Sequence, residues 1–125
     1  MDLEIIEYDP IYKDDFKNLN IEWIEKYFTV EPHDLEQLDD PEGYILNNGG
    51  MIFFAKYGNE IVGTCALIKT DVTSYELAKM AVSPKYQGIG AGRLLGQAAI
   101  EAAKKLGATY LYLESNQKLS LIHIW

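Results

Sequence analysis

The sequence predicts an α/β protein whose core is a mixed sheet flanked by helices. The chain has 125 residues, of which 48% are hydrophobic, and this is enough to bury a core without disulfides or a metal ion. Hydrophobic periodicity indicates a strand, two or three helices, three strands, a helix and a strand, in that order. Consecutive strands followed by one strand–helix–strand crossover are typical of a mixed sheet, not of a doubly wound parallel one. We therefore expect residues 1–125 to form a single domain.

The first fifty residues are expected to form one strand followed by helices. Residues 3–8 favour a short strand that ends at Asp9-Pro10, where proline stops pairing and can open a helix. Apolar residues recur at steps of three and four over residues 11–28, which predicts a helix, although Asn18 and Asn20 leave a division into two helices open. Two shorter helical segments are expected after it, over residues 32–40 and 42–46.

From residue 51 the sequence changes to a two-residue period, which is typical of strands. Two apolar segments, 51–57 and 60–68, are separated by Gly58-Asn59, a pair that favours a tight hairpin turn. A further strand is expected over residues 75–82. A glycine cluster, a long helix and a strand over residues 109–114 complete the expected order.

Composition excludes several classes of function. The single cysteine, Cys65, cannot form an internal disulfide and lies among small apolar residues, so we expect it in the core. With two histidines beside it, the chain offers no recognisable set of metal ligands, and no metal is expected. No apolar run is long enough to cross a membrane and the amino end lacks the features of a secretory signal, so a cytoplasmic location is expected.

Charge is distributed unevenly along the chain. The net charge is −8, which argues against nucleic acid as a partner. Residues 1–50 hold fourteen acids and three lysines, a balance of −11, whereas residues 51–125 hold five acids and eight basic residues, a balance of +3. The acidic half favours a cationic ligand and the basic half an anionic one, although acids that only keep the surface soluble explain the pattern about as well.

The segment from Tyr86 to Arg93 contains three glycines at alternate positions, between a strand and a helix. Backbone N–H groups of such a loop, together with the helix dipole, favour a phosphate, and Arg93 could contact it. A tight helix-packing turn is the alternative without a ligand. A Walker loop is excluded because the Gly-Lys-Ser/Thr sequence is absent. A dinucleotide fingerprint, with Glu114 after the next strand, stays open as a lesser alternative.

The same segment resembles the GCN5-related N-acetyltransferase (GNAT) family. The family pattern Gln/Arg-x-x-Gly-x-Gly/Ala is matched by residues 87–92, it follows a strand that ends in Val82-Ser83-Pro84, and it precedes Leu111-Tyr112-Leu113-Glu114-Ser115-Asn116. The resemblance covers residues 3 to about 119. It implies a central, mostly antiparallel sheet with flanking helices, and it implies binding of acetyl-coenzyme A (acetyl-CoA).

The resemblance also assigns roles to residues of this chain. The pyrophosphate would meet the backbone of the glycine loop, the pantetheine arm would pair with the preceding strand, and an asparagine after the following strand would lie near the cofactor. The cofactor-binding residues implied in this way are Met80, Ala81, Val82, Gln87, Gly88, Ile89, Gly90, Ala91, Gly92, Arg93 and Asn116.

Acetyl transfer needs a base for the amine and an acid for the departing thiolate. For the base we predict Glu76, which lies on the same face as Met80 and Val82 if the strand is regular; a solvated acid at a strand end is the alternative. The tyrosine that serves as the acid in the family has no counterpart here. Trp125 falls at or next to its position and His123 is a weak substitute, so the acid is unassigned. Relative to the family, the chain looks C-terminally truncated.

The function expected from this resemblance is acetyl-CoA-dependent N-acetylation of a small-molecule or peptide amine, by direct attack in a ternary complex. The acidic early helices would shape the acceptor site and attract a cationic amine, with candidate residues Glu22, Trp23, Tyr27, Phe28, Glu31, His33 and Asp34; a helix core face with solvated acids explains these about as well. Two alternatives stay open: a catalytically impaired acyl-CoA-binding remnant of the family, and a nucleotide-binding domain.

The carboxyl end predicts self-association. Without further strands, the strand over residues 109–114 would keep an open edge, and the apolar tail over residues 119–125 would cover a neighbour. A two-fold homodimer is the simplest arrangement. The alternative is a tail that folds back as a last helical turn on its own sheet.

Overall fold

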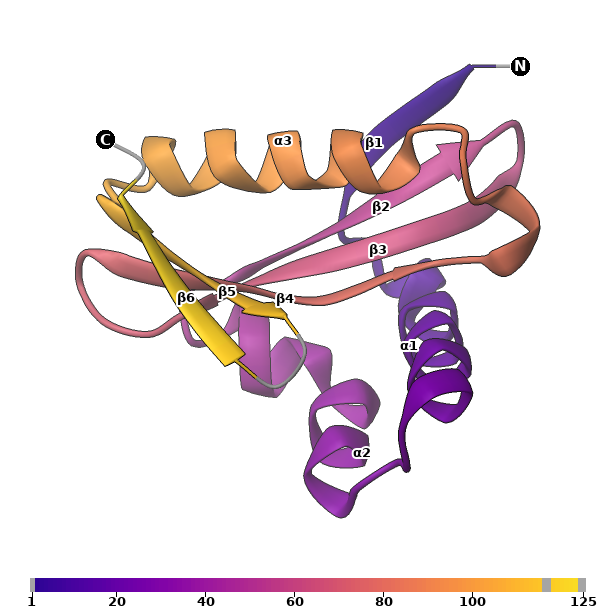
Figure 1. Ribbon diagram of the computed structural model, residues 1–125, viewed down its shortest axis with the longest axis horizontal. Helices are drawn as coiled ribbons and strands as arrows, with labels where there is room; N and C mark the ends of the chain where they lie inside the picture. Colours follow the sequence, from indigo (N-terminus) through magenta and orange to yellow (C-terminus); the bar gives the residue numbers. More distant parts are fainter. Residues whose placement is uncertain (1, 116–117, 124–125) are drawn as a thin grey trace.

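The computed structural model describes residues 2–115 and 118–123 (Figure 1). Among these residues, six strands form one sheet in the order β1-β2-β3-β4-β5-β6. The strands are β1 (Leu3–Glu7), β2 (Met51–Tyr57), β3 (Glu60–Lys69), β4 (Ser74–Val82), β5 (Tyr110–Ser115) and β6 (Lys118–His123). Neighbours pair antiparallel except β4 and β5, which run parallel because helix α3 (Ala91–Lys105) crosses between them. The predicted mixed, mostly antiparallel α/β sheet is confirmed.

Helices cover both faces of the sheet (Figure 1). Helix α3 lies on one face, and α1 (Lys13–Tyr27) and α2 (Pro32–Asp39) lie on the other. A 3-10 turn (Pro10–Tyr12) leads into α1, and a π-helical turn (Glu42–Leu46) follows α2. Asn20 does not divide α1, because its buried side-chain amide donates a hydrogen bond to the Phe16 carbonyl oxygen 2.9 Å away.

Each face of the sheet packs its own hydrophobic cluster. The cluster under α3 has twelve buried members, among them Phe53, Val62, Cys65, Leu67, Tyr75, Leu95 and Leu111. The cluster under α1 and α2 consists of Phe16, Leu38, Ile45, Ile52, Phe54, Ile61 and Ala66. Alternate residues of β2 divide between the two clusters, as its two-residue period requires. In β3 the alternation is interrupted: the register with β2 shifts between Ala55 and Lys56, so Val62 is an extra residue and shares the cluster under α3 with Cys65.

Strand β4 contains a β-bulge that its sequence does not predict. Thr64 of β3 pairs with Ala81, and Ala66 pairs with Ala78, so Cys65 alone stands opposite both Lys79 and Met80. Lys79 adopts φ +54°, a left-handed conformation that is unusual for a residue with a side chain. The extra residue shifts the alternation of side chains by one position from there on.

The bulge corrects the expected position of Glu76. Glu76 pairs with Ile68, which packs on the cluster under α1 and α2, whereas Met80 and Val82 pack on the cluster under α3. Glu76 therefore does not share a face with Met80 and Val82. The expectation was wrong because it assumed a regular strand.

The parallel ladder between β4 and β5 is short. Among the described residues it runs from Ser74 with Tyr110 to Leu77 with Leu113. Residues 78–82 continue β4 beside β3, but among the described residues they have no partner in β5. Their backbone N–H and C=O groups on the β5 side therefore face the space beside the sheet.

The outer edge of β5 is covered by the chain itself. Strand β6 pairs antiparallel with β5 over the whole length of β5, from Ser115 with Lys118 to Tyr110 with His123. The expected open edge of the strand over residues 109–114 is therefore absent, because residues 118–123 fold back as a strand.

Candidate active site

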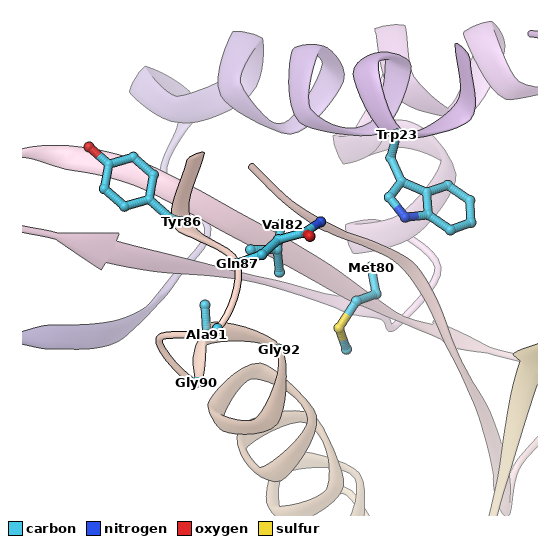
Figure 2. Close-up of a pocket in the computed structure, with 9 residues that line it drawn as sticks. Trp23, Met80, Val82, Tyr86, Gln87, Gly90, Ala91 and Gly92 are labelled. Atoms are coloured by element: carbon cyan, nitrogen blue, oxygen red, sulfur yellow. The ribbon is translucent and has the colours of Figure 1, made fainter. Parts of the chain in front are cut away.

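A groove opens where β4, the glycine loop and α1 meet. Its volume is about 520 Å³. It lies where β5 no longer accompanies β4, so α3 reaches it from one face of the sheet and α1 from the other. Figure 2 shows Trp23 of α1 beside Met80, with the first turn of α3 on the opposite side. The residues that line it are Trp23, Met80, Val82, Tyr86, Gln87, Gly88, Gly90, Ala91 and Gly92.

The glycine loop presents backbone donors to this groove. A 3-10 turn (Pro84–Tyr86) follows β4, and Gly88 (φ +88°) and Gly90 (φ +93°) then take conformations that favour glycine. Gly90 caps α3, and the first backbone hydrogen bond of the helix runs from the N–H of Leu94 to the Gly90 carbonyl oxygen, at 3.1 Å. The N–H groups of the preceding first turn have no acceptor inside the helix, so this end of the groove favours an anion.

Strand β4 forms the floor of the groove. The side chains of Met80 and Val82 line it, and Gly92 of α3 approaches both closely. The bulge turns both side chains toward α3, and the unaccompanied edge of residues 78–82 adds backbone donors and acceptors. One groove thus combines an extended backbone edge with an anion-binding loop.

The structure places most, but not all, of the predicted cofactor-binding residues along the groove. Seven of them line it: Met80, Val82, Gln87, Gly88, Gly90, Ala91 and Gly92. Ala81 is 1% exposed and turns away, and Ile89 is 41% exposed but does not line the groove. Arg93 is exposed, with its Nη2 near Gly90: a Cβ on Gly90 would lie 3.8 Å from it. Asn116 lies outside the described residues.

Two aromatic residues at the groove were not among the predicted cofactor-binding residues. Trp23 had been considered only for the acceptor site, and it contacts the half-exposed Phe28 with ring centroids 5.7 Å apart. Tyr86 stands directly before Gln87 in the sequence, and this position is the one signal that places it near the glycine loop.

Tyr86 lies between the groove and a second hollow. This hollow has a volume of about 610 Å³ and is lined by Tyr57, Asn59, Glu60 and Tyr86. The rings of Tyr86 and Tyr57 meet edge to face, with their centroids 5.7 Å apart. The pKa of Tyr86 is raised, mainly by loss of solvent and to a lesser extent by a hydrogen bond to Glu60. These contacts fix the ring at its end of the groove.

The candidate base is described by the structure but does not line the groove, whereas the side chains considered for the acid are not described. Glu76 is partly buried on the α1 and α2 side of β4 and is not among the groove-lining residues. Trp125 and the side chain of His123 fall outside what the structure describes, so the acid stays unassigned. Cys65 is fully buried, as expected, and burial raises the pKa of its thiol to about 12, which leaves it unreactive near neutral pH.

Within the described part of the chain, no group of three or more histidine, cysteine or acidic side chains could hold a metal ion. The same residues include no helix that is both long and apolar enough to span a membrane.

Comparison with known proteins decides the family. The profile of the Acetyltransferase (GNAT) family matches residues 14–120, which include the helices, the bulged strand and the glycine loop. The chain belongs to the GNAT family. The GNAT resemblance stated from the glycine loop is thereby confirmed.

One relative of this chain is the uncharacterized N-acetyltransferase YvbK of Bacillus subtilis. The two sequences are 38% identical over 81 residues, which cover 62% of this chain and 52% of YvbK. An uncharacterized N-acetyltransferase of Mycobacterium tuberculosis is 35% identical over 83 residues, 66% of this chain and 49% of the relative. The chain spans about half the length of the curated relatives it matches.

Solved structures agree with the GNAT fold. A GNAT-family acetyltransferase of Staphylococcus aureus superimposes with a TM-score of 0.82 at 27% identity, covering 91% of this chain and 73% of the other. A GNAT acetyltransferase of Elizabethkingia anophelis with acetyl-CoA bound gives a TM-score of 0.58 at 28% identity, covering 91% and 66%.

Proposed function

We propose that the chain binds acetyl-CoA in the groove beside β4 and transfers the acetyl group to a primary amine. One observation carries the proposal: the unaccompanied backbone edge of residues 78–82 and the donors of the glycine loop lie along the same groove. A ligand with an amide-containing arm and a pyrophosphate needs both features in this order. The GNAT relative from E. anophelis that holds acetyl-CoA supports the same ligand.

The proposed contacts follow from the lining of the groove. The pyrophosphate would accept hydrogen bonds from the loop between Gln87 and Arg93, and the pantetheine arm would run along residues 80–82 of β4. Arg93 would add a mobile positive charge from the surface of α3. Asn116 is proposed to contact the cofactor as well.

The proposed chemistry is direct attack in a ternary complex. The amine nitrogen attacks the thioester carbonyl carbon, and a bond from nitrogen to carbon forms. The bond from carbon to sulfur breaks, and coenzyme A leaves as its thiolate, which takes up a proton from water because no side chain is assigned as the acid. Glu76, on the face of β4 toward α1 and α2, would accept the amine proton through water. A backbone N–H of β4 would stabilise the negative charge that develops on the carbonyl oxygen.

The acceptor is proposed to be cationic. The helices on the far side of the groove belong to the half of the chain with a balance of −11, and Trp23 brings one of them to the groove itself. This field attracts an ammonium group and concentrates the amine near the thioester.

Two measurements test the proposal. Calorimetric titration with acetyl-CoA, NAD and ATP should show binding of acetyl-CoA alone, and preference for either nucleotide would overturn it. Thiol release from acetyl-CoA, followed with a panel of amines, should then reveal turnover. Tight binding without turnover on any amine would instead favour the alternative of a catalytically impaired acyl-CoA-binding remnant.

We further propose that residues 1–125 act as one acetyltransferase domain that associates as a homodimer. The open edge expected on β5 is absent, but among the described residues β6 is the outermost strand on that side of the sheet, and an outermost strand favours pairing with another chain. Light scattering at several protein concentrations measures the association, and a monomer at every concentration would contradict it.

A further inference from the structure

An ion pair joins the bulge of β4 to the start of α2. Nζ of Lys79 lies 3.9 Å from Oδ1 of Asp34, and the two side chains are only 15% and 17% exposed. The pair between Lys17 and Asp39 is shorter, at 2.6 Å, but its side chains are 40% and 54% exposed. The Lys79–Asp34 pair is therefore shielded from solvent, and its attraction is screened less by water and salt.

The lysine of this pair occupies the left-handed position of the bulge. Its φ of +54° is unfavourable for a residue with a Cβ and persists only where surrounding contacts hold it. The bulge decides which face the following residues present, because a slip of one residue would turn Met80 and Val82 away from the groove.

The aspartate of the pair is itself held in place. Its Oδ2 accepts a hydrogen bond from the N–H of Glu31 at 3.0 Å, within a capping box at the amino end of α2. His33, 74% exposed, approaches the other carboxylate oxygen with Nε2 at 3.5 Å. Asp34 thus offers Lys79 a charge whose position is fixed by the first turn of a helix.

We propose that Asp34 is a positioning residue: through its ion pair with Lys79 it holds the β4 bulge and so keeps Met80 and Val82 in the groove. The inference deepens the proposed function and rests on it for the identity of the ligand, acetyl-CoA. It also links α2, on the acceptor side, to the strand that forms the floor of the groove.

The test removes each charge and keeps the rest of the geometry. Asp34→Asn retains an oxygen that can accept the capping hydrogen bond from Glu31, and Lys79→Met retains the apolar stem of the lysine. Lys79→Arg is the conservative variant. Asp39→Asn is the matched control, since it removes one negative charge from the same helix and breaks only the exposed pair with Lys17.

Three quantities are measured on the full chain: hydrogen exchange of peptides that cover residues 78–82, the Kd for acetyl-CoA, and the urea midpoint. Asp34→Asn and Lys79→Met should each speed exchange in this segment and weaken acetyl-CoA binding by roughly five- to tenfold, and the double variant should be no worse than either single one. Lys79→Arg keeps the positive charge, so its exchange rate and its Kd should stay within about twofold of the wild-type values. Asp39→Asn should change neither exchange nor Kd.

The positioning role is overturned if exchange of residues 78–82 stays at the wild-type rate, if the two single effects add in the double variant, or if only the urea midpoint falls. A wild-type chain that binds no acetyl-CoA would refute the proposed function instead, and the exchange measurement would still decide whether the ion pair holds the bulge.

Discussion

Gly92 of α3 lies directly against Val82 of β4: a methyl group placed on Gly92 would come within 3.9 Å of Val82 Cγ2. The same methyl group would lie 4.0 Å from Sδ of Met80. Both distances are ordinary van der Waals contacts, so the backbone tolerates the added carbon. Because all three residues line the groove, the missing side chain of Gly92 is space left open for a ligand.

Gly92→Ala should therefore stabilise the fold and leave ligand binding nearly unchanged. We expect a gain of about 0.5 kcal/mol in the free energy of unfolding, because alanine restricts the unfolded chain and favours the helix. The added methyl group should change the Kd for acetyl-CoA by less than about threefold, since it makes ordinary van der Waals contacts and the family pattern accepts alanine at this position. Urea denaturation and calorimetric titration measure the two effects on the same sample.

Gly96→Ala is the control for this prediction. Gly96 lies one turn further along α3, and a Cβ there would meet no atom within 4 Å. It should gain about as much stability, or somewhat more, without any change in Kd. A tenfold loss of acetyl-CoA affinity in Gly92→Ala, with wild-type affinity in Gly96→Ala, would contradict this and show that the ligand packs tightly against Gly92.

Local signals in the sequence are enough to predict much of the fold. The β2–β3 hairpin follows from Gly58-Asn59 between two alternating segments, and Gly58 indeed takes φ +64°. The glycine loop was found for the same reason, since only glycine reaches the φ values of residues 88 and 90 without strain. In each case the residue type determines the backbone conformation.

Features held by contacts distant in sequence could not be predicted this way. The bulge lies at Lys79, which has a side chain, and the neighbour that holds it, Asp34, is 45 positions earlier. Trp23 lies at the groove because α1 packs across the sheet. The hydrophobic period of α1 predicts a helix but not the direction in which that helix packs. Strand β6 exists because β5 offers it an edge. From its apolar sequence alone we predicted contact with a neighbour, or a last helical turn on its own sheet, and not a strand.

Gly90 offers a test of the anion site. Its φ of +93° makes any side chain there strained, so Gly90→Ala and Gly90→Asp should both lose about 1 kcal/mol of stability. Gly90→Asp also places a carboxylate at the amino end of α3, where the pyrophosphate is proposed to lie. Its Kd for acetyl-CoA should rise at least about tenfold more than that of Gly90→Ala, because the ligand would meet a like charge. Equal affinities in the two variants would place the pyrophosphate elsewhere.

Glu76 is tested by its effect on turnover. Glu76→Gln removes the proton acceptor but keeps the shape of the side chain, so the rate with a responsive amine should fall roughly a hundredfold. The Kd for acetyl-CoA should stay nearly unchanged, because Glu76 does not line the groove. Steady-state kinetics across pH and titration measure the two quantities.

The control for Glu76→Gln is Glu101→Gln, which removes an equal charge from the exposed surface of α3 and should leave turnover intact. A Glu76→Gln variant that turns over at the wild-type rate at every pH would move the base to an acid of α1 or α2.

Cys65 predicts how stability depends on pH in the alkaline range. Its thiol is fully buried, with Sγ 3.7 Å from the Leu95 carbonyl oxygen, and burial raises its pKa from 9.0 to about 12. Below pH 9 the thiol is protonated in both the folded and the unfolded chain, so it adds no pH dependence. Between pH 9 and 12 the unfolded chain has lost this proton and the folded chain has kept it. The unfolded state then binds fewer protons, and the free energy of unfolding falls by up to about 1.4 kcal/mol per pH unit.

Cys65→Ala isolates this contribution from the tyrosines and lysines that titrate in the same range. At pH 8 the variant should be less stable than wild type, because it leaves a small cavity in the cluster under α3. As the pH rises toward 11, the stability difference should shrink and then reverse, since only the wild-type chain carries the thiol that the folded state keeps protonated. Urea denaturation of both proteins at half-unit steps from pH 8 to pH 11 measures the difference. A difference that stays constant over this range would mean that the thiol titrates in the folded protein as it does in the unfolded chain, and that solvent reaches Cys65 beneath α3.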